Sequence, residues 1–247
     1  MAKNKLAKFA ELETFDHVFQ LPSHRLRAGE IFDLKGKWRS EFFKNDNPIV
    51  LELGCGKGEY TVELAEEYPE KNYIGVDIKG ARLWTGAKLA QKENLTNVAF
   101  IRADIEMIHH FFDKDEIDEI WLTFPDPQMK KPRKRLTSTG FISLYQNFLK
   151  SESVINLKTD SNFMFTYTTA LVKVNNFDIL AYNEDIYASD NLDPILAIKT
   201  FYEKQWLERG ITIKYISFVP GHKAELVEPD IEIEPDPYRS YKRDRRI

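Results

Sequence analysis

The sequence lacks the features that mark several protein classes. Its 247 residues include one cysteine, Cys55, so no disulfide can form within the chain. No run approaches the roughly 18 apolar residues of a membrane-spanning helix. The opening residues 1–5 are not followed by the apolar stretch of a secretory signal. We therefore expect a cytoplasmic protein with no membrane anchor, and the sequence leaves open whether it is a monomer or a homodimer.

Neither sign of charge dominates the chain, whose formal net charge is −4 at pH 7. That balance excludes a protein that is basic over its whole surface. A local cluster is nevertheless basic, and it comprises Lys130, Lys131, Arg133, Lys134 and Arg135. Because salt screens exposed charges over about 8 Å, a polyanion that meets this cluster would interact with it more strongly than with distant acids. The alternative is that the cluster is an ordinary solvated loop.

Strand-like and helix-like segments alternate from residue 49 onward. Short apolar runs predict strands at 49–53, 73–77, 98–101, 117–124, 154–158, 178–183 and 211–219. Helical patterns lie at 60–68, 83–90, 139–150, 161–175 and 195–208. This alternation predicts right-handed βαβ crossovers and an α/β fold, namely a Rossmann-like, doubly wound, mostly parallel sheet of about seven strands.

We divide the chain into three parts. Residues 1–40 form a mildly basic N-terminal extension that we expect to be irregular, and residues 41–221 form the α/β domain. Residues 222–247 form a charged C-terminal tail. Six acids and two prolines lie between Glu225 and Asp236, and we expect this stretch to be solvated. The last eleven residues include Arg239, Lys242, Arg243, Arg245 and Arg246.

A glycine-rich turn, GCGKG at 54–58, follows the first strand of the predicted sheet. Glycine lets the backbone approach a ligand closely and adopt positive φ, which favours binding at Gly54 and Gly56. A dinucleotide fingerprint would need its third glycine at position 59, where Glu59 stands. A glutamate there, near Glu52, would repel a pyrophosphate. A cofactor with a nucleoside and no phosphate fits better, and S-adenosylmethionine is such a cofactor.

Acidic residues follow or end four of the predicted strands: Glu52, Asp77, Asp104 and Asp126. Ligands of open α/β sheets bind at the carboxyl ends of the strands. Asp77 suits the two ribose hydroxyls as a charge-assisted acceptor, and Asp104 suits the adenine amino group. The alternative is that these acids only cap the next helix, or that Glu52 only pins the loop backbone.

Several motifs together resemble one family closely. They are LELGCGKG at 51–58, GVD at 75–77, TFPDP at 123–127 with the basic cluster, LKTD at 157–160 and TFYE at 200–203. Over about residues 20–220 the chain is similar to the bacterial tRNA (guanine-N7)-methyltransferases. The resemblance implies a class I methyltransferase domain, S-adenosylmethionine as cofactor and tRNA as partner. It also implies methyl transfer to N7 of guanine 46 in the variable loop.

The resemblance also implies roles for individual residues. Glu52, Asp77, Asp104 and Asp126 match cofactor positions, beside Gly54 and Gly56 of the turn, and Asp126 is also the expected catalytic residue. Substrate-contacting positions are matched by Lys130, Asp160, Thr200, Phe201, Tyr202 and Glu203. The chain departs from the family where Gln128 replaces the usual tryptophan, and where the basic cluster is one residue shorter and contains Pro132.

The chemistry of such a reaction follows from guanine itself. Because N7 carries a lone pair and no proton, methylation needs in-line placement rather than a general base. Positive charge moves onto the purine, and a nearby carboxylate stabilises it. Asp126, held between two prolines that restrict its backbone, is expected to do this, unless Pro-Asp-Pro is only a rigid turn. Phe124, Phe201 and Tyr202 are candidates for stacking on a base, or else core aromatics.

Two other functions stay open at this stage. The chain is alternatively a methyltransferase for another RNA or a small molecule, or a non-catalytic RNA-binding module. We expect no metal site, since His109 and His110 have no further histidine or cysteine at ligand spacing. Cys55 is expected to be a packing residue and not a nucleophile.

Overall fold

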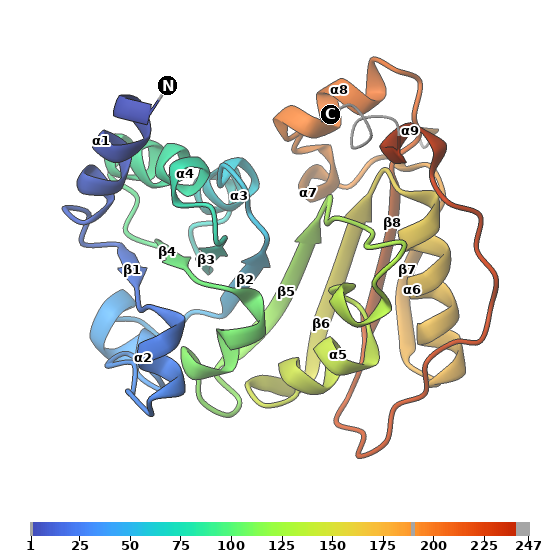
Figure 1. The fold of residues 1–247 in the computed structure, drawn as a ribbon, viewed down its shortest axis with the longest axis horizontal. Coiled ribbons are helices and arrows are strands. Elements are labelled where there is room, and N and C mark those ends of the chain that lie inside the picture. Colours follow the sequence, from blue (N-terminus) through green and yellow to red (C-terminus); the bar gives the residue numbers. More distant parts are fainter. Residues whose placement is uncertain (1, 189–190, 241–247) are drawn as a thin grey trace.

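The computed structural model describes residues 2–188 and 191–240 (Figure 1). Residues 241–247, the basic end of the predicted tail, lie outside the described residues. The strands of the described part are β1 (Val18–Gln20), β2 (Ile49–Leu53), β3 (Asn72–Val76), β4 (Val98–Arg102), β5 (Ile117–Thr123), β6 (Leu149–Thr159), β7 (Asp178–Asn183) and β8 (Lys214–Val219). They form one sheet in the order β1-β4-β3-β2-β5-β6-β8-β7.

Helices connect these strands. The α-helices are α1 (Ala2–Leu12), α2 (Ser23–Arg27), α3 (Glu59–Glu67), α4 (Gly80–Lys92), α5 (Thr139–Tyr145), α6 (Asn162–Val174), α7 (Pro194–Ala197), α8 (Phe201–Leu207) and α9 (Pro237–Ser240). A π-helix, η1 (Trp38–Phe43), and the 3₁₀ turns η2 (Ile105–His110), η3 (Pro132–Lys134) and η4 (Ile186–Ala188) complete the described elements. No helix among these residues is both long and apolar enough to cross a bilayer.

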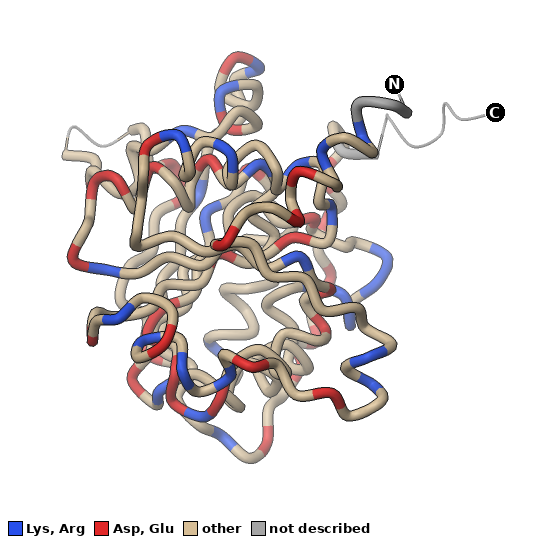
Figure 2. The backbone as a smooth tube through the Cα atoms, turned by 90° about the vertical axis from the view of Figure 1, so that its left-hand side faces the viewer, with Lys and Arg blue, Asp and Glu red and all other residues tan. Residues whose placement is uncertain are grey.

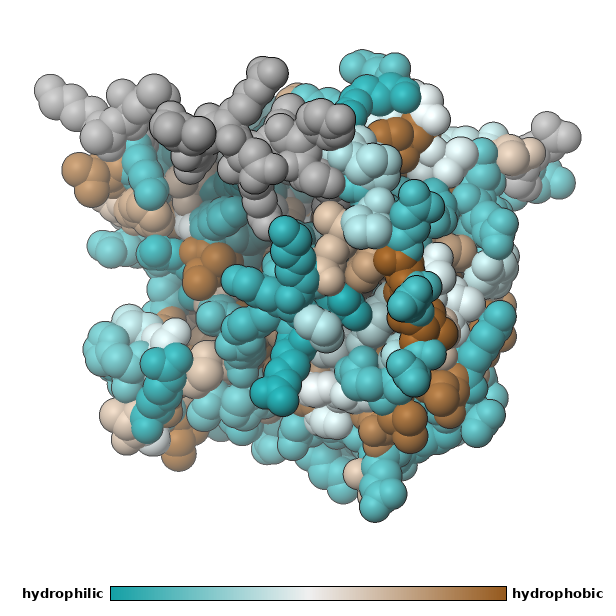
Figure 3. All heavy atoms as spheres, turned by 45° about the vertical axis from the view of Figure 1, so that its right-hand side comes forward, coloured by the Kyte–Doolittle hydropathy of each residue, from teal (hydrophilic) through white to brown (hydrophobic). Residues whose placement is uncertain are grey.

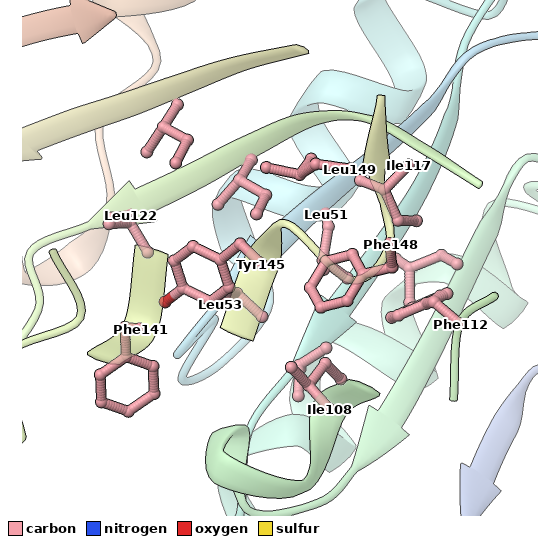
Figure 4. Packing of buried hydrophobic residues seen from close by; sticks show 14 of the residues in the cluster. Leu51, Leu53, Ile108, Phe112, Ile117, Leu122, Phe141, Tyr145, Phe148 and Leu149 are labelled. Carbon is pink, nitrogen blue, oxygen red and sulfur yellow. The ribbon is translucent and has the colours of Figure 1, made fainter. Parts of the chain in front are cut away.

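Each face of the sheet carries its own hydrophobic core, because side chains alternate along every strand. In β2, Leu51 and Leu53 join the cluster that includes α5 and α6, whereas Val50 joins the cluster of α3 and α4. Figure 4 shows Leu51 and Leu53 in the first cluster with Tyr145 of α5 and Ile108 of η2. The predicted doubly wound sheet is confirmed, with eight strands in place of about seven.

The strand order places a topological switch point between β2 and β5. From β2 the chain builds β3 and β4 on one side, and it then returns to build β5 and β6 on the other. β2 pairs in parallel with both β3 and β5, so the loops after β2, β3 and β5 meet at one edge of the sheet. Ligands of such sheets bind at this point, and the arrowheads of β5 and β6 point toward α7 and α8 there (Figure 1).

The N-terminal extension is not irregular, contrary to our expectation. Val18–Gln20 pairs in parallel with β4 as an added edge strand, and Leu12 of α1 is buried in the cluster that contains α4. Trp38 is fully buried, and its indole Nε1 donates to the Phe111 carbonyl at 3.0 Å. These contacts join residues far apart in sequence, so a local pattern does not reveal them.

The helix predicted at 195–208 is broken into α7 and α8. Thr200 ends the break with extended backbone, and its Oγ1 accepts the Glu203 N–H at 3.2 Å as an N-cap. The helix predicted at 139–150 is also shorter, because the chain enters β6 at Leu149.

The acidic stretch of the C-terminal tail is not solvated throughout. Asp236 is buried, and its carboxylate accepts the backbone N–H of Phe163 at 3.1 Å near the start of α6. Glu228 accepts both the backbone N–H and the hydroxyl of Thr139, at 2.9 and 2.7 Å. Two of the six acids therefore cap helices, which explains why this segment lies against the domain.

Candidate active site

The glycines of the turn after β2 have two different functions. Gly54 and Gly56 have φ of +83° and +59°, and a Cβ built on Gly54 would meet no atom within 4 Å. A Cβ on Gly58 would lie 2.6 Å from the Phe100 ring. The first two glycines therefore shape an open cradle in which a ligand can approach the backbone, while the third allows α3 to pack closely on the sheet.

Hydrogen bonds tie this turn to the end of β3. The N–H groups of Gly54 and Cys55 donate to the Val76 carbonyl at 2.8 and 3.0 Å. The Asp77 carboxylate accepts the Gly56 N–H at 3.0 Å through Oδ2 and the Lys79 N–H at 2.6 Å through Oδ1. Asp77 is therefore held in one orientation beside the glycine cradle.

Glu52 lies at the base of the site and is buried. Its carboxylate accepts hydrogen bonds from the hydroxyls of Thr61 on α3 and Thr123 on β5. Burial raises the pKa of Glu52, and the two threonine hydroxyls act in the opposite direction by stabilising the carboxylate. Glu52 therefore joins β2, α3 and β5 beneath the glycine turn.

Two adjoining pockets share Gly54 and Asp77 at the switch point. The larger, about 190 Å³, is also lined by Asp104, and the smaller, about 100 Å³, is also lined by Glu52. Asp104 caps η2 by accepting the Glu106 N–H at 3.1 Å through Oδ1. The structure thus brings Glu52, Gly54, Asp77 and Asp104 together, as the sequence predicts, and Gly56 also lines the smaller pocket.

The loop after β5 carries Asp126 between two residues in left-handed conformation. Phe124 has φ of +51° and Gln128 has φ of +47°, which is costly for residues other than glycine. Phe124 lines the smaller pocket and Gln128 the larger. Asp126 is exposed between them, with Oδ1 accepting the Gln128 N–H at 3.1 Å. The missing tryptophan is thus replaced by a residue whose backbone orients the loop.

The basic cluster divides into exposed and buried members. Lys130, Lys131 and Arg133 are exposed, and no acidic side chain among the described residues lies within 4 Å of their charged groups. Lys134 pairs with Glu106. Arg135 is buried, and its guanidinium lies 4.3 Å from the Tyr167 ring centroid. Arg135 is therefore not exposed to a polyanion as the rest of the cluster is, because its guanidinium packs against Phe163 and Tyr167 of α6.

The segment 200–203 lies over the glycine turn. Phe201 is 44% exposed and is not a core aromatic. Its backbone N–H donates to the Glu59 carboxylate at 3.0 Å, and the Lys57 ammonium lies 3.8 Å from its ring centroid. Thr200 and Tyr202 line the smaller pocket. Glu203 is fully buried, and its contact with substrate stays a prediction.

A buried lysine that sequence reasoning missed holds this segment. The Lys158 ammonium, at the end of β6, donates to the carbonyls of Leu196 and Ile198, each at 2.8 Å. It also pairs with Glu203 at 2.8 Å, and both side chains are 0% exposed. Burial lowers the pKa of Lys158, while the Glu203 carboxylate opposes that shift. The LKTD motif contained this residue, but nothing local indicated that it points inward.

Asp160 follows Lys158 by two residues and is also buried, within reach of the C-terminal segment. Cys55 is buried, and burial raises the pKa of its thiol well above the usual value, as suits a packing residue. No group of three or more potential metal ligands occurs among the described residues. Acidic and basic residues are interspersed over the face on the left of Figure 1 (Figure 2), in keeping with the small net charge.

These residues fit S-adenosylmethionine. The open cradle at Gly54 leaves room for a ligand against the backbone, Asp77 and Asp104 are placed as acceptors, and the acidic surroundings suit a sulfonium. Two basic residues line the smaller pocket: the Lys57 ammonium lies over the Phe201 ring, and the Arg82 guanidinium lies 5.9 Å from the Tyr202 ring centroid. Because Glu52, Glu59 and Asp77 line the same pocket, its acids outnumber its basic residues, which suits a cationic nucleoside cofactor better than a pyrophosphate.

Comparison with known proteins agrees with this geometry. Residues 46–216 match a family described as putative methyltransferases. A tRNA (guanine-N(7)-)-methyltransferase of Bacteroides fragilis (strain YCH46) is 58% identical over 246 residues, covering 100% of this chain and 97% of that relative. Its counterpart in Porphyromonas gingivalis (strain ATCC BAA-308 / W83) is 57% identical over 238 residues, covering 95% and 98%.

Solved structures share the fold. The 16S rRNA methyltransferase KamB superposes with a TM-score of 0.58 at 12% identity, over 78% of this chain and 95% of that one. The 16S rRNA (adenine(1408)-N(1))-methyltransferase of Catenulisporales acidiphilia gives 0.55 at 15% identity, over 80% and 96%. The match to the family model and the sequence relatives show that this chain belongs to the bacterial tRNA (guanine-N7)-methyltransferase family.

Proposed function

We propose that this protein transfers a methyl group from S-adenosylmethionine to N7 of a guanine in tRNA, at position 46 of the variable loop, in the cytoplasm. The observation that carries the proposal is the position of Asp126. It lies exposed between two residues that line the two pockets, and the exposed Lys130 and Lys131 follow it within five residues. The names of the relatives support the same substrate.

In this proposal the cofactor lies across the two pockets. Asp77 accepts from the ribose hydroxyls, Asp104 accepts from the adenine amino group, and the backbone at Gly54 and Gly56 lies against the ligand. Glu52 contributes negative charge from beneath. The cofactor, when bound, supplies an electrophilic methyl group on a sulfonium. The chain's contribution is then mainly to place that methyl in line with N7, which is worth several orders of magnitude in rate.

Asp126 acts on the base that receives the methyl group. Since guanine N7 has no proton to lose, Asp126 serves as an acceptor and a negative charge and not as a general base. Its carboxylate accepts from the guanine N1–H or amino group, which orients the ring, and it stabilises the positive charge that develops on the purine. Phe124 and Gln128, both with positive φ, lie on either side of it in the loop.

The exposed lysines bind the RNA backbone. Lys130 and Lys131 lie a few residues after Asp126 and are free to contact phosphates, and Arg133 extends the same surface. Phe201, exposed over the glycine turn, offers a ring on which a base stacks. We include in this proposal that the tRNA contacts Lys130, Asp160 and residues 200–203.

The test is methyl transfer to an unmodified tRNA transcript, with a matched transcript in which guanine 46 is replaced by adenine. We expect labelled methyl from S-adenosylmethionine to enter only the first, at N7. Asp126→Asn should reduce kcat by about 100-fold or more, as expected when one charge-stabilising group is lost, while tRNA binding is retained.

Asp193→Asn provides a matched control, since Asp193 is also an exposed aspartate next to a proline. It should leave kcat within about twofold of wild type, as surface substitutions usually do. Equal labelling of both transcripts would contradict position 46, and incorporation into small molecules alone would remove tRNA as the substrate. Unchanged turnover in Asp126→Asn would refute its catalytic role.

A further inference from the structure

The smaller pocket is lined by charged side chains of both signs. The acids Glu52, Glu59 and Asp77 lie there together with the basic residues Lys57 and Arg82. The face drawn in Figure 3 is different, because a band of apolar residues lies on it among hydrophilic ones. A pocket with both signs of charge suits a ligand that also carries both signs, since each charge of the ligand then meets a complementary one.

The methionine end of S-adenosylmethionine is such a ligand. It carries an ammonium, a carboxylate and the sulfonium that holds the reacting methyl group. With the adenine at Asp104 in the larger pocket, the methionine end extends into the smaller one. The acids there suit the ammonium and the sulfonium, but they repel the carboxylate. The carboxylate therefore needs a hydrogen-bond donor, and preferably a cation, within the smaller pocket.

The backbone of the glycine turn has few N–H groups left for that carboxylate. The N–H groups of Gly54 and Cys55 donate to the last carbonyl of β3, and the Gly58 N–H donates to the Cys55 carbonyl at 2.8 Å. The Gly56 N–H donates to the Asp77 carboxylate. These four N–H groups are already paired within the protein, so a side chain is the better candidate for the donor.

Lys57 is engaged by neighbouring residues of the protein. Its ammonium lies 4.0 Å from the Glu59 carboxylate and 3.8 Å from the Phe201 ring centroid. The Glu59 carboxylate in turn accepts the Phe201 backbone N–H. Lys57 therefore helps to join the glycine turn to the segment 200–203, and its charge is balanced by Glu59.

Arg82, in the first turn of α4, is the other basic residue of the pocket. Its side chain is exposed, and among residues 2–188 and 191–240 no acid forms an ion pair with its guanidinium. The guanidinium lies near the ring of Tyr202, which lines the same pocket. A guanidinium presents two parallel N–H groups that match the two oxygens of a carboxylate. Arg82 therefore has both the position and the chemistry of a carboxylate donor.

We propose that Arg82 binds the carboxylate of the cofactor's methionine moiety. Glu52 and Asp77 supply the negative charge that suits the ammonium and the sulfonium, so the pocket recognises a complete amino acid. Adenosine derivatives that lack the carboxylate are then bound more weakly than the cofactor. The proposal rests on the proposed position of the cofactor across the two pockets.

The test changes the ligand and the side chain together and measures binding by calorimetry on the whole chain without tRNA. The ligands are S-adenosylhomocysteine and its decarboxylated analogue, in which hydrogen replaces the carboxylate. Arg82→Gln should weaken binding of S-adenosylhomocysteine by about tenfold, as expected when a hydrogen bond between charged groups is lost. It should change the affinity for the analogue by less than about twofold, because the group that Arg82 contacts is already absent.

Three further variants sharpen this test. Arg82→Lys keeps the charge but not the paired N–H groups, so its affinity for S-adenosylhomocysteine should fall between wild type and Arg82→Gln. Arg27→Gln is the matched control, since Arg27 is also an exposed arginine on a helix and lines neither pocket. Lys57→Gln should weaken both ligands by the same factor, because Lys57 acts through the segment 200–203.

The tRNA provides a second readout for Arg82. Filter binding of tRNA at increasing salt gives the slope of log K against log salt, which we call the salt slope. Arg82→Gln should leave this slope as in wild type. If Arg82→Gln instead lowers its magnitude by about 1 while S-adenosylhomocysteine binds as before, Arg82 contacts a tRNA phosphate and the proposal is overturned.

Other outcomes are equally decisive. The proposal fails if Arg82→Gln weakens both ligands by the same factor, or if Lys57→Gln shows the carboxylate-dependent loss in its place. If wild type binds neither ligand, the proposed function fails together with the role of Arg82. If wild type binds S-adenosylhomocysteine and Asp77→Asn weakens both ligands equally, but Arg82→Gln changes neither, only the role of Arg82 fails.

Discussion

Lysines in two regions of this molecule have opposite surroundings. Lys158 is fully enclosed and meets two backbone carbonyls and the Glu203 carboxylate. Lys130 and Lys131 extend into solvent from the loop after β5. Lys158 stabilises the fold around the site, whereas Lys130 and Lys131 are accessible to a binding partner. The comparison teaches that a basic residue in a site motif can contact a ligand only if its charged group is exposed.

The strongest test of this comparison breaks the buried pair. Lys158→Met should lower the free energy of unfolding by about 3–5 kcal/mol, because Glu203 is left as an unpaired buried charge. Replacing both residues, as Lys158→Met with Glu203→Leu, should cost less than Lys158→Met alone. Denaturant unfolding of the two variants measures this difference, and equal costs would contradict a net role for the pair.

Substitution of Arg135 should change the free energy of unfolding by an intermediate amount. Arg135 belongs to the basic cluster in sequence, but its side chain is buried. Arg135→Ala should lower the free energy of unfolding by about 1–2 kcal/mol through its lost contacts with Tyr167 and Phe163. The salt slope of tRNA binding should stay as in wild type. A reduced slope at unchanged stability would place Arg135 with the phosphate-binding residues after all.

The exposed lysines should affect stability least. Lys130→Ala with Lys131→Ala should change the free energy of unfolding by less than about 0.5 kcal/mol. The same double variant should reduce the magnitude of the salt slope by about 1.5, for two lost phosphate contacts. Filter binding over a salt series, with Lys114→Ala as the control, measures this. A slope equal to that of wild type would exclude both lysines from the RNA contact.

The parts of the site that sequence predicts are those that local pattern encodes. The apolar runs of β3, β4 and β5 place Asp77, Asp104 and Asp126 at one edge, because parallel strands bring their carboxyl ends together. Long-range contacts were not predicted. The hydroxyls of Thr61 and Thr123 meet Glu52 from two other elements, and no spacing within the chain indicates this.

The same limit explains the broken helix. Residues 195–208 have a helical pattern, yet Lys158 takes up the carbonyls of Leu196 and Ile198, so the chain can leave the helix there without unsatisfied acceptors. The partner lies about forty positions away. Arg135 is likewise buried against the Phe163 and Tyr167 rings of α6, a contact that the local sequence around Arg135 does not predict.

The short strand β1 affects the whole sheet. Without it, β4 would present unpaired N–H and C=O groups at an open border, where an extended peptide or another chain can add on. Val18–Gln20 occupies that border in parallel register, from Val18 opposite Phe100 to Gln20 opposite Arg102. The first twenty residues therefore cover the edge of β4. We expect a shortened chain that begins after Gln20 to aggregate more readily, because that edge would be exposed.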